Sequence, residues 1–185
     1  MVDITHKITT QRTATAQAIV KVGNPATIQA IRDKNVPKGD VLEVARTAGL
    51  FAVKNTSNAI PDCHPLPIEF TEIKYEILEM EIYIEITVKT IYKTGVEVEA
   101  MHGASIVALT MYDMLKPIDK NVEISTVKLL HKKGGKSDFN DAKSLNLEVA
   151  VAVCSDSVSK GKKQDSAGKA ITSKLNKLGL VVSNY

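Results

Sequence analysis

The chain has 185 residues, of which 44% are hydrophobic and 4% aromatic, with no Trp. That length suits one domain with a small appendage, and the composition predicts an aliphatic core. A formal net charge of +3 is too small to indicate nucleic-acid binding. No apolar run approaches the roughly 20 residues of a membrane span, and the polar start lacks the apolar segment of a signal peptide. Because two cysteines make no disulfide framework, we expect a cytoplasmic protein without a membrane partner.

The N-terminal part of the sequence predicts one strand followed by two helices. Residues 12–22 alternate apolar and polar side chains, which is typical of a half-buried strand. An Asn-Pro pair at positions 24–25 indicates the start of a helix. Asp40 and Glu43 form a capping-box pattern that opens a second helix. Gly49 within it predicts close packing, because glycine costs about 1 kcal/mol relative to alanine inside a helix.

A hairpin and a long helix are expected next. Residues 80–92 alternate strictly, and residues 68–77 alternate with a change of phase near Thr71 that a β-bulge would explain. The two segments should pair with each other. Residues 97–116 follow a helical period, and residues 122–130 form another strand. The helix is expected to bury one stripe, which consists of Val98, Met101, Ala108, Tyr112 and Leu115.

The resulting order, β-α-α-β-β-α-β, predicts an α+β fold: a ferredoxin-like antiparallel sheet with helices on one face. We expect this domain to comprise residues 1–131. Residues 132–145 are rich in Lys, Gly, Asp and Ser and predict a flexible loop and linker. Residues 146–185 show a strand, a helical pattern and the start of another strand. They predict an incomplete α/β fragment, because the β-α-β pattern stops unfinished.

Three polar residues are candidates for proton transfer. Lys38 precedes a helix, whereas Asp113 and Lys116 lie one turn apart at the end of another helix and project from one face. The simpler interpretation of the second pair is a surface ion pair worth roughly a few tenths of a kcal/mol. Burial beside a substrate would instead bring the pKa of a lysine towards neutrality and allow proton transfer.

Two carboxylates and a histidine have a structural and a functional interpretation. Glu97 and Glu99 either offset the dipole at the start of a helix or accept hydrogen bonds from a guanine-type edge. His64 is either structural or an acid, a base or a phosphate donor. With Cys63 as its only neighbour of ligand type, His64 makes a poor zinc motif.

The Gly-Gly-Lys-Ser sequence at positions 134–137 is not a phosphate-binding loop. The first glycine of that motif would fall at Leu130, which argues against an NTPase. Lys136 belongs either to a solvated linker or to a flap that closes over a phosphate.

Several blocks of sequence occur together in a characteristic order. They are the initial MVD, KGDVLEVARTAG at 38–49, CHPLP at 63–67, KTGVEVEA at 93–100, ALTMYDMLK at 108–116 and GGKS at 134–137. Over most of residues 1–137 the chain therefore resembles the cyclic pyranopterin monophosphate synthases of molybdenum-cofactor biosynthesis. The resemblance implies a lyase whose substrate is a guanosine triphosphate already cyclised between ribose and base. Pyrophosphate leaves as the cyclic phosphate of the product forms.

The resemblance also implies roles for individual residues. Lys38, Asp113 and Lys116 would be catalytic, with the two lysines transferring protons. The substrate would be bound by Arg12, Lys54, His64, Glu97, Glu99 and Lys136. The family forms hexamers, as trimers of dimers, with active sites at the dimer interface. The resemblance implies no resident cofactor and no protein-bound metal. It leaves open whether a divalent ion such as Mg²⁺ assists the reaction. His102 departs from the pattern, where smaller side chains are expected.

The C-terminal segment at 149–171, VAVAVCSDSVSKGKKQDSAGKAI, resembles the opening of a molybdopterin adenylyltransferase domain. The matching residues are Ser155, Asp156 and the stretch 165–168, and the Gly-rich nucleotide loop of such a domain is not found in this segment. We therefore expect a truncated form of a bifunctional fusion. The alternative function is a non-catalytic synthase-like scaffold that presents the second domain to a partner. The intact set of lysines and aspartate argues against this alternative.

Overall fold

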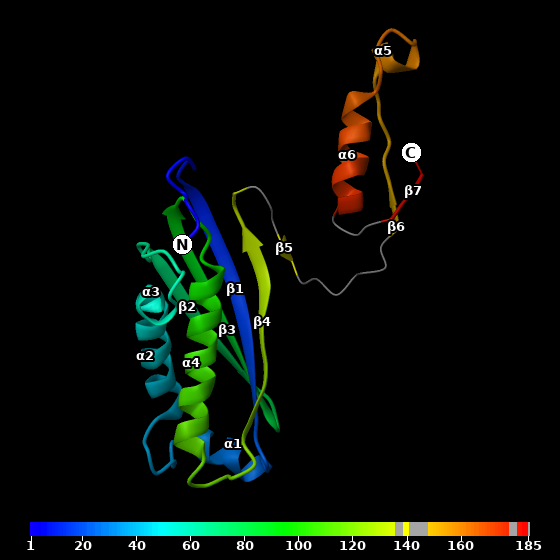
Figure 1. Ribbon diagram of the computed structural model, residues 1–185. Helices are drawn as coiled ribbons and strands as arrows, with labels where there is room; N and C mark the ends of the chain where they lie inside the picture. The colour runs from blue at the N-terminus through cyan, green and yellow to red at the C-terminus, as the bar shows by residue number, and fades with distance from the viewer. Residues whose placement is uncertain (136–138, 141–147, 178–180, 185) are drawn as a thin grey trace. The chain divides into compact units, whose positions relative to one another are not determined.

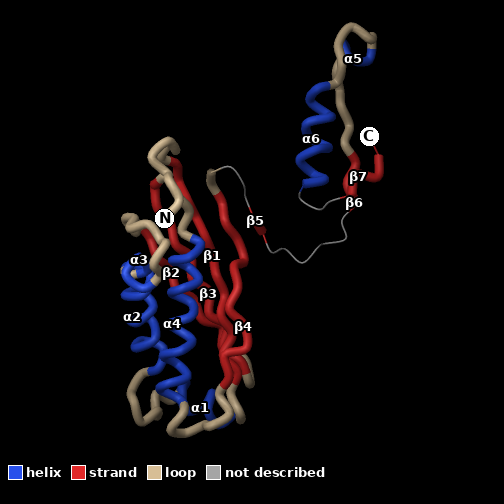
Figure 2. Tube along the Cα trace, viewed as in Figure 1, coloured by secondary structure: helices blue, strands red, loops and turns tan. Residues whose placement is uncertain are grey.

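The computed structural model describes residues 1–135, 139–140, 148–177 and 181–184. The chain forms two compact units, Met1–Asp141 and Ala142–Tyr185. Figure 1 shows the first unit as a sheet with helices packed against one face, and Figure 2 distinguishes these two layers by colour. Lys136 and most of the expected linker lie outside the described residues.

The first unit has a ferredoxin-like sheet. Its elements are, in chain order, β1 (Thr10–Lys21), α1 (Pro25–Arg32), α2 (Val41–Lys54), α3 (Thr56–Ala59), β2 (Phe70–Ile77), β3 (Glu81–Tyr92), α4 (Glu97–Leu115), β4 (Glu123–Lys133) and β5 (Phe139–Asn140). All neighbouring strands are antiparallel, in the order β2-β3-β1-β4-β5. The expected fold class is confirmed, because β1 and β3 occupy the centre and the main helices cover one face.

Alternation along the two central strands determines which face the helices cover. On β3 the side chains directed at the helices are isoleucine and valine, and on β1 they are mostly alanine. These residues are all completely buried: Ala14, Ala16, Ala18, Val20, Ile82, Ile84, Ile86 and Val88. The intervening residues point to the other face, where the hydroxyls of Thr15 and Thr87 lie 2.9 Å apart. The small side chains of β1 leave room for α4 to lie directly on the sheet.

The expected β-bulge near Thr71 is wrong. β2 and β3 pair in unbroken register along the whole of β2. The alternation changes phase in the sequence because Ile68 precedes the strand, which begins only at Phe70. The register shifts lie instead between β1 and β4, beside Ala16 and Val20.

α4 buries a different stripe from the predicted one. Of the predicted residues Ala108 and Leu115 are buried, whereas Val98 is 43% and Tyr112 38% exposed. The prediction failed because α4 is apolar on both faces, so its sequence does not select the face that meets the sheet. The residues that line its buried side include Ala100, Gly103, Ala104, Val107, Met111 and Leu115.

Glycines allow α2 and α4 to pack closely. A Cβ added at Gly49 of α2 would overlap the side chain of Val107 on α4. A Cβ added at Gly103 of α4 would lie 2.6 Å from Cγ2 of Val53 on α2. The close packing predicted at Gly49 is therefore confirmed. The contact fixes the two helices side by side and thereby positions the loops at their ends.

The second unit contains a parallel β-α-β arrangement. Its elements are β6 (Glu148–Ala150), α5 (Asp156–Ser159), α6 (Ser166–Lys177) and β7 (Val181–Asn184). β6 and β7 pair in parallel, as expected for an α/β fragment. At the start of α6 the Asp165 carboxylate accepts a hydrogen bond of 2.8 Å from the backbone N–H of Gly168. In the part of the chain that the structure describes, no helix is long and apolar enough to cross a membrane.

Replacing Gly49 with alanine should destabilise the first unit. We expect Gly49→Ala to lower the free energy of unfolding by about 1–3 kcal/mol, because Val107 would have to move. This loss should exceed the gain of about 1 kcal/mol in helix propensity. Chemical denaturation measures the difference. Thr47→Ala, on the exposed face of the same helix, should change the free energy of unfolding by less than about 0.5 kcal/mol. A Gly49→Ala protein as stable as the wild type would contradict the close contact.

Candidate functional site

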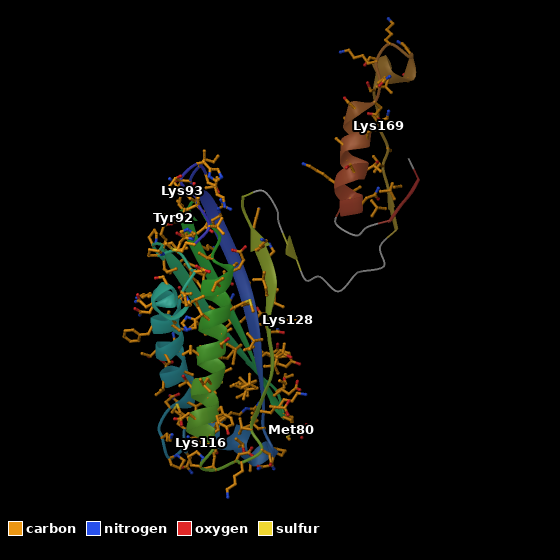
Figure 3. All side chains as sticks on the ribbon, viewed as in Figure 1. Met80, Tyr92, Lys93, Lys116, Lys128 and Lys169 are labelled. Atoms are coloured by element: carbon orange, nitrogen blue, oxygen red, sulfur yellow. The ribbon has the colours of Figure 1, made fainter. Side chains whose placement is uncertain are left out.

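The predicted site residues lie at opposite ends of α4. Glu97 and Glu99 are in its first turn, whereas Asp113 and Lys116 are at its C-terminal end. Because an α-helix rises about 1.5 Å per residue, Glu97 and Asp113 are about 24 Å apart along it. Figure 3 labels Lys93 near one end of the first unit and Lys116 at the other.

The C-terminal end of α4 carries the lysine–aspartate cluster, which consists of Lys38, Asp113 and Lys116. Asp113 Oδ2 accepts from Lys38 Nζ at 2.6 Å, and Oδ1 lies 2.7 Å from Lys116 Nζ. The hydrogen bonds from Lys116 and then Lys38 lower the pKa of Asp113 to about 2. The hydrogen bond to Asp113 raises the pKa of Lys116. The structure thus brings together the three predicted catalytic residues, with the carboxylate ionised and Lys116 protonated at neutral pH.

Two buried or capping carboxylates hold the loops that carry this cluster. Asp40 caps α2 by accepting a hydrogen bond of 3.2 Å from its first turn, directly after the loop with Lys38. Asp119 follows α4 and is only 5% exposed. It accepts from Gly23 N at 2.7 Å and from Thr27 Oγ1 at 2.8 Å. Burial alone would raise the pKa of Asp119, but the hydrogen bonds together outweigh burial, and the net pKa is lowered. The carboxylate therefore stays ionised and ties the end of α4 to α1.

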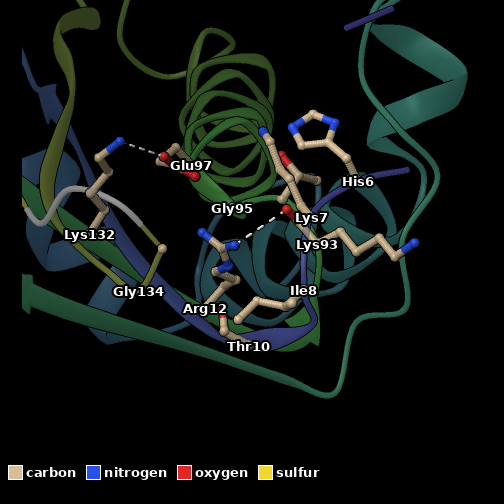
Figure 4. Close-up of a pocket in the computed structure, with 12 residues that line it drawn as sticks. His6, Lys7, Ile8, Thr10, Arg12, Lys93, Gly95, Glu97, Lys132 and Gly134 are labelled. Carbon is tan, nitrogen blue, oxygen red and sulfur yellow. Dashed lines mark hydrogen bonds and ion pairs between the residues drawn. The ribbon is translucent and has the colours of Figure 1, made fainter. Parts of the chain in front are cut away.

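The other end of the unit contains a cavity of about 690 Å³, which we call the cation pocket. Figure 4 shows its lining, which includes the cationic side chains of Lys7, Arg12, Lys93 and Lys132. Arg12 Nη2 donates to the carbonyl oxygen of Lys93 at 3.3 Å. Lys132 Nζ lies 2.9 Å from Glu97 Oε1. These cations outnumber the one carboxylate of the lining, which favours a phosphorylated ligand.

A smaller cavity of about 270 Å³, which we call the carboxylate pocket, shares Thr94, Gly95 and Glu97 with the cation pocket. It is lined also by His64, Cys63 and Glu99. Glu99 is 2% exposed, and its Oε1 accepts a hydrogen bond of 3.1 Å from the Cys63 thiol. Burial raises the pKa of Glu99, and the hydrogen bond from Cys63 only partly opposes this. Burial and then Glu99 raise the pKa of Cys63 to about 12, so the thiol stays protonated.

The structure gathers most of the predicted substrate-binding residues around these two pockets. Arg12 and Glu97 line the cation pocket, and His64 and Glu99 line the carboxylate pocket. Lys54 is exposed at the end of α2 and lines neither pocket. Within the described residues, no group of three or more His, Cys, Asp or Glu is placed to hold a metal ion.

Sequence reasoning missed Lys93 and Lys132. Lys132 belonged to the expected linker, but β4 continues to Lys133, so its backbone is held in the sheet opposite Ala14. The extension of β4 gives Lys132 a fixed direction towards Glu97. Lys132 could have been found only if residues 131–133 had been recognised as a continuation of the strand that pairs with β1. Their charged and polar side chains do not indicate a strand.

This fold and these pockets define an α+β domain with a cationic pocket suited to a phosphorylated small molecule. Residues 1–135 match the model of the MoaC family, and the chain belongs to that family. It is 50% identical over 143 residues to a cyclic pyranopterin monophosphate synthase of Clostridium perfringens (strain SM101 / Type A), with 76% of this chain and 90% of that protein covered. A synthase of Syntrophomonas wolfei is 49% identical over 139 residues, with 74% and 88% covered. The predicted resemblance is confirmed.

A further relative contains more than this chain. The molybdenum cofactor biosynthesis bifunctional protein of Chlorobaculum tepidum is 42% identical over 182 residues. The match covers 98% of this chain and therefore continues through the second unit, but it spans only 57% of that relative.

The lysine–aspartate cluster predicts an unusual titration. Asp113 should titrate near pH 2, and Lys116→Ala should raise its pKa towards the ordinary 3.8, because Lys116 has the largest lowering effect. The ¹³C chemical shift of the carboxyl carbon measures this directly. Lys34→Ala removes a lysine that pairs with Asp40 instead and should leave the titration of Asp113 unchanged. An identical pKa of Asp113 in wild type and Lys116→Ala would rule out a maintained ion pair.

Proposed function

We propose that the first unit is a cyclic pyranopterin monophosphate synthase that acts in molybdenum-cofactor biosynthesis. As a lyase it would convert the cyclised guanosine triphosphate to the cyclic phosphate product and release pyrophosphate. The observation that carries the proposal is the lysine–aspartate cluster, which is complete in a chain about half identical to named synthases. A protein retained only as a scaffold has no need of three converging ionised side chains.

Each part of the site has a distinct task in this proposal. The cation pocket binds the triphosphate through Arg12, Lys93 and Lys132. Glu97 and Glu99 accept hydrogen bonds from the guanine-type edge, which requires ionised carboxylates. Lys116, protonated beside Asp113, donates a proton as the imidazole-derived ring opens. Lys38, which pairs with the other oxygen of Asp113, exchanges protons as the new ring closes. We propose no resident cofactor, and a divalent ion such as Mg²⁺ would enter with the triphosphate.

We propose that each active site is shared between two copies of the chain. Within one chain the cluster lies about 24 Å from Glu97, whereas proton transfer needs contacts of about 3 Å. A second copy can bring its own cluster to the pockets. The helix layer offers a surface for this, because it leaves large apolar side chains exposed to solvent that a partner could cover. They are Val44, Phe51, Val98, Leu109 and Tyr112. A trimer of such dimers gives the hexamer expected from the family.

The second unit favours an additional role. Because the match to the bifunctional relative runs through it, we propose that it is the beginning of a molybdopterin adenylyltransferase domain fused to the synthase. A non-catalytic scaffold that presents this domain is the alternative function. We also propose a cytoplasmic location, where the Cys63 thiol can remain reduced and bonded to Glu99.

Turnover of the cyclised guanosine triphosphate tests both the reaction and the shared site. The wild type should form product, detected as the fluorescent oxidised pterin, whereas folded Lys116→Ala and Glu97→Gln should each form none. Co-assembly of these two variants should restore about a quarter of the wild-type activity, because about half of randomly formed dimers are mixed and each mixed dimer has one intact site of its two. A wild-type hexamer without turnover would overturn the synthase proposal.

A second mixture provides the matched control. Lys116→Ala and Asp113→Asn change the same cluster, so no arrangement of mixed dimers contains an intact site and activity should stay absent. If hetero-oligomers of Lys116→Ala and Glu97→Gln form but remain inactive, the site lies within one chain.

A further inference from the structure

The thiol of Cys63 contacts a carboxylate that has almost no access to water. Glu99 is 2% exposed, and its Oε1 accepts a hydrogen bond of 3.1 Å from Cys63 Sγ. Among the residues that the structure describes, no other side chain donates to this carboxylate. The thiol therefore determines which oxygen of Glu99 is already occupied, and it leaves Oε2 to meet a ligand in the carboxylate pocket.

The loop around Cys63 is held by contacts with the rest of the unit. The backbone N–H of Cys63 donates to the carbonyl oxygen of Ile60 at 3.0 Å, which closes a turn. Further along the loop, the carbonyl oxygen of Pro67 accepts a hydrogen bond of 2.6 Å from the completely buried Thr90 of β3. Pro65 restricts the backbone between these two points. The position of the thiol is therefore set by the fold of the unit.

The thiol is the donor in this contact. Burial and then Glu99 raise the pKa of Cys63 to about 12, so Cys63 keeps its proton at neutral pH. An ionised carboxylate has no proton to donate and can only accept. A hydrogen bond to a charged acceptor is stronger than one between neutral groups. The contact can therefore hold the carboxylate in one orientation, although a thiol is ordinarily a weak donor.

Other groups that can carry charge also face Glu99 from the two elements around it. They are Asp62 and His64 of the loop before β2, and Glu97 and His102 of α4. Burial has the largest influence and raises the pKa of Glu99, and the neighbouring carboxylate of α4 raises it further. The hydrogen bond from Cys63 is the largest influence that lowers this pKa, ahead of the histidine of α4. Removing the thiol therefore removes the main support of the ionised carboxylate.

We propose that Cys63 is a positioning residue, whose thiol orients the Glu99 carboxylate so that Oε2 can accept from the guanine-type edge of the substrate. This inference rests on the proposed function for the identity of the ligand, although the contact between thiol and carboxylate does not. A buried carboxylate without this donor would rotate away from the ligand or take up a proton. Either change removes an acceptor that the substrate needs.

Replacing Cys63 tests this role. We expect Cys63→Ala to lower kcat/KM by about fivefold or more, through a higher KM, because Glu99 binds the substrate and transfers no proton. The loss should be largest at acid pH, because a carboxyl whose pKa has risen further is protonated sooner as the pH falls. In the ligand-free protein, the ¹³C-detected titration of the Glu99 carboxyl should move to higher pH. Cys63→Ser keeps a donor at this position and should bring both measurements back to within about twofold of the wild type.

The infrared S–H stretching band measures the hydrogen bond without any substrate. The chain has two cysteines, and the second, Cys154, is exposed. Cys154→Ala leaves only the band of Cys63, whereas Cys63→Ala leaves only the band of Cys154. The band of Cys63 should lie at the lower frequency, because donation to a carboxylate weakens the S–H bond. Cys154→Ala is also the matched control, and it should leave kcat/KM and the titration of Glu99 unchanged.

Three results would contradict the inference. The two S–H bands could coincide, or Cys63→Ala could leave the titration of Glu99 and the acid limb of the pH profile unchanged. A fall of kcat/KM by one factor at every pH, which Cys63→Ser does not restore, would show that Cys63 only fills space in its loop. If the wild type shows no turnover but Cys63→Ala shifts the titration of Glu99 as expected, the proposed function fails and the positioning of Glu99 stands.

Discussion

The site depends on how closely α4 can approach its neighbours. Alanines on β1 let the helix lie directly on the sheet, and Gly49 and Gly103 let α2 pack against it without intervening side chains. An interior packed this closely tolerates little added volume, and it permits little movement of its helices and strands relative to one another. α4 is therefore held rigidly in place, and the distance between the loops at its two ends is constant. Every candidate residue that the structure describes, apart from Lys54, is attached at or beside one of these ends.

The two ends differ in their electrostatics. At the C-terminal end all three charged groups are half-exposed and satisfy one another, so their charges cost little in the free domain. At the other end Glu99 is buried with a raised pKa, and cations gather around Glu97 and Arg12 with few carboxylates to neutralise them. Such an uncompensated arrangement is stabilised by an anionic ligand. In the function that we propose, this asymmetry assigns binding to one end and proton transfer to the other, and a second copy of the chain brings the two together.

The sequence predicted the order and type of the main elements because their signals are local. The alternation of residues 80–92 and the cap at Asp40 each involve neighbours in the chain. The failures have a different origin. The stripe of α4 that faces the sheet could not be chosen from a helix that is apolar on both faces, and Val98 and Tyr112 prove to be exposed. The direction of Lys132 depends on a strand pairing that its charged neighbours conceal.

For the site itself, local spacing predicted the contact of Asp113 with Lys116 but not the approach of Lys38 across 75 residues of chain. The resemblance to the family supplied that grouping, which physical spacing alone could not. The depth of Glu99 was equally unpredictable, because the first turn of a helix is usually open to solvent. The loop that contains Cys63 contacts Glu99 through the thiol, and that loop is placed by tertiary packing.

The chemistry expected of Lys116 is also sharpened by its contacts. Burial alone lowers the pKa of a lysine, which suggested a side chain poised near neutrality. In the structure the hydrogen bond and charge of Asp113 outweigh that effect and raise the pKa of Lys116. Covering the cluster with a second copy would remove water from both partners. The lower effective dielectric would then strengthen their attraction as well as the cost of burying each charge. In the reaction that we propose, Lys116 therefore enters as an acid, and it can act as a base only after it has given its proton to the substrate.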